Sequence, residues 1–141
     1  MEKRSRETVR EDAEAASRPG WEGLRVWWLI DGPEAGSREL VFNTTTFPPG
    51  KWHELHRHPR AEEALYIVSG SGLHLSEGEP VRQRAGEVVH IPRGEWHGFA
   101  NDSDEPAVII AVFGGVATYA EAGYEVNPEQ PAAMPSARES G

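Results

Sequence analysis

Short apolar runs, separated by glycine and proline, recur along residues 21–126. These runs are LRVWWLI, ELVFNTTTF, EEALYIVSG, GLHLSEG, GEVVHIP and AVIIAVF. They are rich in β-branched and aromatic residues and recur about every ten positions, which predicts short strands. Many short strands at even spacing favour a β-sandwich or β-barrel. We therefore expect a single all-β domain over residues 21–126.

Helical structure has little room in this pattern. One helical turn is expected over residues 117–123, ATYAEAG. Residues 1–20 are charged throughout and end at Pro19-Gly20, and residues 127–141 are rich in Pro, Ala and Ser. Both ends are therefore expected to be flexible segments outside the folded domain. The run at residues 107–113 is apolar at every position, so we expect both of its faces to be covered, in part by a second subunit.

Composition and charge exclude several classes of function. The chain has 23 Asp and Glu against 14 Lys and Arg, a net charge of −9. No basic cluster stands out, so we expect neither a nucleic acid nor an anionic membrane as partner. Cysteine is absent, which excludes disulfides and thiolate metal ligands. The N-terminus has no apolar signal region and no run reaches membrane-spanning length, so a soluble cytoplasmic protein is expected.

The segment KWHELHRHPRAEE concentrates titratable side chains. A strand places His56 and His58 on one face, whereas a helix would separate them. The same alternation puts Trp52 on their side. Glu62 and Glu63 must point to opposite faces, and parity alone does not choose between them. Taken alone, the segment also fits a surface strand that carries histidines by chance.

A second segment, GEVVHIPRGEWHGFAN, completes a two-part signature with the first. The first part is Gly, five residues, His-x-His, three or four residues, Glu, six residues and Gly. The second part is Gly, five residues, Pro-x-Gly, two residues, His, three residues and Asn. Together they are matched by Gly50, His56, His58, Glu63 and Gly70, and by Gly86, Pro92, Gly94, His97 and Asn101. This pattern resembles the cupin superfamily, which implies a double-stranded β-helix, or jelly-roll barrel.

The resemblance implies that His56, His58, Glu63 and His97 bind one metal ion. It selects Glu63, because six residues separate Glu63 from Gly70, whereas seven separate Glu62 from it. Three imidazoles and one carboxylate suit a divalent first-row metal, with Fe(II) favoured and Mn, Ni, Cu or Zn also compatible. Four protein ligands on a six-coordinate ion leave two positions for a substrate, or for a substrate and dioxygen.

Other residues near this cluster have weaker assignments. Trp52 and Phe99 share the parity of the ligands and are candidate walls of a substrate pocket, although barrel core is the slightly favoured interpretation for Phe99. His53 and His74 are expected at the surface. Tyr66 is expected to point away from the metal. No residue beyond the ligands is identifiable as a catalytic acid or base.

Fold alone does not determine function, because cupins include many kinds of enzymes and ligand sensors. Our first expectation is a metal-dependent dioxygenase acting on a small, aromatic or dicarbonyl substrate. The alternatives are a non-oxidative cyclase or isomerase of polyketide-type metabolism, and a metal-tethered binding protein without turnover. Compact cupins commonly pair through an outer sheet, so a homodimer is expected.

Overall fold

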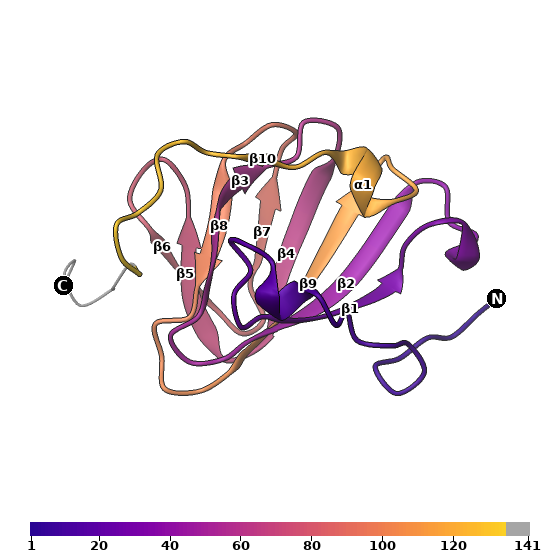
Figure 1. The fold of residues 1–141 in the computed structure, drawn as a ribbon, viewed down its shortest axis with the longest axis horizontal. Coiled ribbons are helices and arrows are strands. Elements are labelled where there is room, and N and C mark those ends of the chain that lie inside the picture. Colours follow the sequence, from indigo (N-terminus) through magenta and orange to yellow (C-terminus); the bar gives the residue numbers. More distant parts are fainter. Residues whose placement is uncertain (135–141) are drawn as a thin grey trace.

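Two five-stranded antiparallel sheets pack face to face in the computed structural model, which describes residues 1–134 (Figure 1). The first sheet has the order β1-β2-β9-β4-β7 and the second β10-β3-β8-β5-β6. The first comprises β1 (Arg25–Ile30), β2 (Leu40–Phe47), β9 (Ala107–Gly114), β4 (Glu62–Ser69) and β7 (Val88–Ile91). The second comprises β10 (Glu125–Val126), β3 (Trp52–Arg57), β8 (His97–Ala100), β5 (Ser71–Leu75) and β6 (Val81–Arg84). This is the jelly-roll arrangement that the sequence predicts.

Alternation along the strands separates core from surface. In β9 every second residue from Ala107 to Phe113 is buried, while Val108, Ile110 and Val112 are only partly covered. The strand is therefore apolar on both faces but buried on one, since successive side chains of a strand point to opposite faces. The second face belongs to the outer surface of the first sheet.

Strand β3 contains a β-bulge that reverses its alternation. His53 pairs with Phe99 and His56 pairs with His97, so β3 has one more residue than β8 between these two pairs. Gly98 lies opposite the extra residue, and a Cβ there would lie 2.7 Å from the carbonyl oxygen of His53. A bulge leaves backbone groups without ladder partners.

The C-terminal segment satisfies those groups. The Leu55 amide donates to Oε1 of Gln130 at 2.9 Å, and Nε2 of Gln130 donates to the Leu55 carbonyl at 2.7 Å. Met134 packs on an apolar cluster outside the second sheet. Residues 127–134 thus lie against the barrel, whereas the sequence led us to expect a flexible tail. The rest of that tail, residues 135–141, lies outside the described residues.

The N-terminal segment also contacts the barrel. The Asp12 amide donates to the Val26 carbonyl in β1 at 2.8 Å, and Ala15, in the 3-10 helix η1 (Ala15–Ser17), is fully buried. The ordered fold therefore extends beyond the limit at residue 21 expected from the sequence. A second 3-10 turn, η2, spans Pro33–Ala35.

The predicted helical turn is α1 (Tyr119–Ala122). Thr118 caps it by accepting a hydrogen bond from the Glu121 amide at 3.1 Å. Within the described residues, no helix has the length and apolar character needed to cross a bilayer.

Candidate metal centre and substrate cavity

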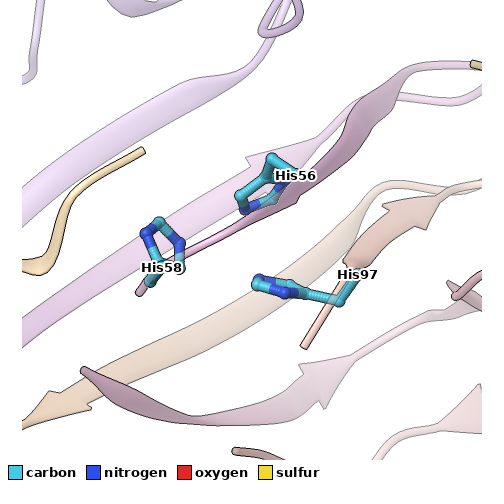
Figure 2. Close-up of side chains that lie close together, drawn as sticks. All are labelled: His56, His58 and His97. Carbon is cyan, nitrogen blue, oxygen red and sulfur yellow. The ribbon is translucent and has the colours of Figure 1, made fainter. Parts of the chain in front are cut away.

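Three histidines and one glutamate converge between the two sheets. His56 lies in β3, His58 just after it, and His97 begins β8, while Glu63 comes from β4 in the opposite sheet. One nitrogen from each histidine lies within 4.8 Å of the others (Figure 2). Oε1 of Glu63 lies 2.9 Å from Nε2 of His97 and 3.6 Å from Nε2 of His58. All four side chains are buried.

Backbone carbonyls determine which nitrogen of each imidazole is free. Each of the three histidines places its Nδ1 within hydrogen-bond distance of a carbonyl oxygen. Because a carbonyl only accepts, each Nδ1 carries the proton, and Nε2 keeps its lone pair. The acceptors are Glu54 for His56 at 2.6 Å, Gly123 for His58 at 2.7 Å and Glu95 for His97 at 2.9 Å.

Burial and mutual charge set the protonation of this cluster. Burial lowers the pKa of His58, and burial together with the neighbouring imidazoles lowers the pKa of His56 well below its usual value. Burial alone would raise the pKa of Glu63, but the adjacent His97 and His58 outweigh it, so that pKa is lowered. The Glu63 carboxylate in turn overcomes burial at His97 and raises its pKa. Burial thus favours the neutral form of His56 and His58, while Glu63 and His97 each favour the charged form of the other.

Two atoms of this cluster lack any hydrogen bond. Nε2 of His97 and Oε1 of Glu63 are fully buried and, although close, do not meet hydrogen-bond geometry with each other. Buried polar atoms without partners are rare and costly. Three nitrogen lone pairs and one carboxylate oxygen directed to a common point are the donor set of a first-row divalent cation. The residues present therefore fit such an ion.

A cavity adjoins this cluster, which we call the inner cavity. Its walls are largely aromatic and aliphatic, and within residues 1–134 neither lysine nor arginine lines it. Phe99 is one wall, in edge-to-face contact with Phe47. Trp52 is not, because the bulge in β3 turns it outward onto the cluster of Leu55 and Leu73. Phe99 thus remains a candidate substrate contact, and Trp52 lies away from the cavity.

The family model of the cupin domain matches residues 43–113, half of the chain. The chain belongs to the cupin family. This match spans the strands that supply all four clustered side chains, so the resemblance of the two-part signature is confirmed.

Relatives of this cupin differ in activity. It is 32% identical over 109 residues to tetracenomycin polyketide synthase protein TcmJ of Streptomyces glaucescens, covering 76% of this chain and 73% of that protein. It is 34% identical over 85 residues to gentisate 1,2-dioxygenase of a Ralstonia species, covering 58% of this chain but 23% of that enzyme. The chain spans about half or less of the length of several curated relatives that it matches.

The fold has close counterparts among solved structures. The polyketide cyclase RemF of Streptomyces resistomycificus superposes with a TM-score of 0.70 at 24% identity, covering 95% of this chain and 84% of that one. At this identity the likeness concerns the fold.

Two further histidines of this cupin lie inside, where the sequence led us to expect surface residues. His53 lines the inner cavity with its ring 4.2 Å from that of His56, because the bulge puts both on the inner face. His74 is buried in β5 and stacks parallel to His97, with ring centroids 6.4 Å apart. The pairing of His74 with Phe99 across β5 and β8 places it on the inner face. That pairing could not be derived from the short segment GLHLSEG.

Sequence reasoning also missed three aromatic residues at the mouth of the cavity. Trp21 and Tyr119 line it directly, and Tyr124 stacks on His56 with centroids 4.8 Å apart. All three lie in loops or at the ends of elements, where strand periodicity carries no signal. Glu62 is exposed and pairs with His90 at 2.9 Å, in agreement with the selection of Glu63 by spacing.

Proposed function

We propose that this cupin is a metal-dependent enzyme that acts, without consuming dioxygen, on a keto-enol or β-dicarbonyl substrate, as a cyclase or isomerase. The observation that carries the proposal is the converging donor set of three imidazoles and Glu63, in a cavity that no lysine or arginine of the described residues 1–134 lines. A substrate that binds there must offer its oxygen atoms to the metal centre, because the walls provide no cation for a carboxylate. The relative TcmJ, matched over most of both chains, supports a polyketide-type substrate.

The residues of the site have separate tasks in this proposal. His56, His58 and His97 would hold a divalent ion through Nε2, and Glu63 would offset part of its charge. Such an ion supplies Lewis acidity, which stabilises an enolate. Burial favours the neutral form of His56 and His58, which keeps their lone pairs available. At His97 a bound cation would take the place of the proton that Glu63 favours.

His53 is a non-ligand titratable group in the cavity wall. Its Nδ1 donates to the Gly20 carbonyl at 2.8 Å, which leaves Nε2 as an acceptor. Burial lowers the pKa of His53 to about 4, so it is neutral at pH 7. It can therefore accept a hydrogen bond from the enol hydroxyl of a substrate and orient it.

Anaerobic assays with defined metals test the proposal. Protein loaded with Zn²⁺ should convert a panel of β-diketones and polyphenolic ketones under argon, with the loss of enol absorbance as the readout. The same protein carrying His58→Ala should be inactive. Turnover that occurs only with iron and consumes dioxygen would contradict the proposal.

A dioxygenase is the second candidate. It is favoured by the similarity to gentisate 1,2-dioxygenase over the cupin domain and by a donor set that also suits Fe(II). An oxygen electrode distinguishes the two candidates, because only the dioxygenase consumes one O₂ for each product formed. Binding without product in either assay would indicate a protein that tethers a ligand through its metal.

A further inference from the structure

A second concavity adjoins the inner cavity, and we call it the outer cleft. Four aromatic residues form much of its wall: Trp21, Trp28, Tyr119 and Tyr124. Trp21 and Tyr119 line both spaces. The two rings lie edge to face with centroids 6.0 Å apart. The outer cleft therefore adjoins the inner cavity, and these two residues separate the two spaces.

The two spaces differ greatly in size. The inner cavity has a volume of about 40 Å³, while the outer cleft, measured in the same way, has about 730 Å³. One water molecule needs roughly 10–15 Å³ on this measure. The inner cavity thus admits only a few atoms beside the metal cluster. A larger substrate must leave most of its body in the outer cleft.

Hydrogen bonds that two aromatic side chains donate to carboxylates hold the aromatic walls in place. Nε1 of Trp28 donates to Asp12 at 3.1 Å, and the hydroxyl of Tyr124 donates to Glu54 at 2.8 Å. Trp28 also packs on Tyr119, with centroids 4.6 Å apart. Walls fixed in this way offer flat apolar surfaces that lose little conformational freedom on binding.

The charge of the cleft disfavours an anionic body. Three carboxylates line it, those of Asp12, Asp31 and Glu54, against one described cation, Arg18. The guanidinium of Arg18 pairs with Asp12 at 3.3 Å and lies over the Trp21 ring at 4.8 Å. The positive charge of Arg18 is therefore already paired within the protein. Negative charge on a ligand in this cleft would face two further carboxylates.

We infer that the outer cleft binds the uncharged, planar aromatic part of the substrate, while its oxygen-bearing head reaches past the edge of the Trp21 and Tyr119 pair toward His56, His58 and His97. The inference rests on the proposed function in assigning the head to the metal. It adds that the substrate has at least two fused rings. Small dicarboxylates are poor ligands, since they leave the cleft empty and carry the disfavoured charge.

Calorimetric titration of the Zn²⁺-loaded protein with two probes tests this inference. Catechol carries the head alone, and 2,3-dihydroxynaphthalene carries the same head with a second ring. The two-ring probe should bind at least tenfold more tightly. The 6-sulfonate of 2,3-dihydroxynaphthalene should lose most of this gain in affinity, because its negative charge would face the carboxylates of the cleft.

A variant that fills the cleft without removing a wall residue completes the test. Ala120 is exposed and lines the outer cleft, so Ala120→Trp should abolish the preference for two rings and leave catechol affinity within twofold. Ala85→Trp, at an exposed turn position of the β6–β7 connection, is the matched control and should keep the preference.

Equal affinities for the two probes, or an unchanged preference in Ala120→Trp, would overturn the inference. The result of these binding measurements does not depend on whether the protein converts any substrate. Tighter binding of the two-ring probe without conversion of any substrate would count against the proposed function alone. Conversion of β-diketones without a preference for two rings would count against the inference alone.

Discussion

At the scale of single residues, the metal cluster depends on one nitrogen of each histidine. His58 is held by the Gly123 carbonyl through Nδ1, and its Nε2 faces the other ligands. The resemblance of the two-part signature to cupins implied this residue, together with His56, Glu63 and His97, as metal ligands, and that assignment stays a prediction. The same reasoning missed His53 and His74, whose positions depend on a bulge and on pairing with β8.

Replacement of His58 should abolish metal binding. In His58→Ala one imidazole donor is lost from the cluster, and bound Zn²⁺ or Fe²⁺ after reconstitution should fall by more than tenfold, since even indirect changes near metal ligands cost about that much. Elemental analysis measures the bound metal. His90→Ala, at an exposed position, is the control and should retain full occupancy. Undiminished metal in His58→Ala would refute the assignment.

His74 should make the metal-free protein sensitive to acid. Burial lowers its pKa to about 4, and its Nδ1 has no hydrogen bond. The unfolded chain takes up a proton near pH 6.5, before the folded chain does, so this contribution to stability is present above pH 6.5 and is lost as the pH falls toward 4.

Between pH 7 and pH 5, the wild-type protein should therefore lose about 2 kcal/mol more unfolding free energy than His74→Phe loses. Urea unfolding of EDTA-treated protein at both pH values measures it. Val81→Phe, at an exposed position of β6, adds a phenyl group without removing a titratable side chain and should leave the pH dependence as it is in the wild type. An unchanged pH dependence in His74→Phe would show that the imidazole is solvated.

At the scale of elements, the bulge in β3 decides which side chains reach the cavity. Strict alternation of side chains along β3 would place Trp52 on the same face as His56 and His58. The extra residue instead turns Trp52 outward and His53 inward. A bulge depends on backbone pairing with β8 and on support from Gln130, which is remote in sequence. The strands could therefore be predicted from periodicity, but this change of face could not.

Gly98 should be indispensable to the bulge. In Gly98→Ala the new Cβ would lie 2.7 Å from a backbone oxygen that cannot move aside freely. We expect a loss of about 1–3 kcal/mol in unfolding free energy. Metal affinity should fall as well, since His97 precedes this position. Urea denaturation and metal titration measure the two effects.

Gly114→Ala is the matched control for this substitution. A Cβ at that position would meet only the Glu62 side chain, at 3.7 Å. Its stability should stay close to that of the wild type. Equal stability of the two alanine variants would show that the close approach of backbone atoms at Gly98 does not affect the free energy of unfolding.

At the scale of the whole molecule, the outer face of the first sheet is apolar. Val88 pairs with Tyr66, which pairs in turn with Ile110, and the first two are substantially exposed. An exposed apolar patch of this kind is typical of an interface between subunits. The predicted homodimer stays a prediction, and this face is where it should form. The sequence indicated an apolar strand but not which of its faces stays open.

A charge on this face should keep the chain monomeric. Val88→Glu would place a carboxylate within the patch, so light scattering after gel filtration should give the mass of one chain, against twice that mass for the wild type. Val81→Glu is the control, because Val81 on β6 is equally exposed at 60%. A wild-type monomer at micromolar concentration would contradict the prediction.

The segment from α1 to β10 contributes to both the entrance and the metal cluster. Its Gly123 carbonyl holds His58, while its Tyr119 and Tyr124 line the outer cleft. Anyone who grafts this segment from another cupin to widen substrate scope would therefore change the orientation of a metal ligand in the same step. Substrate range and metal affinity should thus change together, and engineering of either should include Pro59 and Arg60, whose side chains lie where a Cβ at position 123 would be.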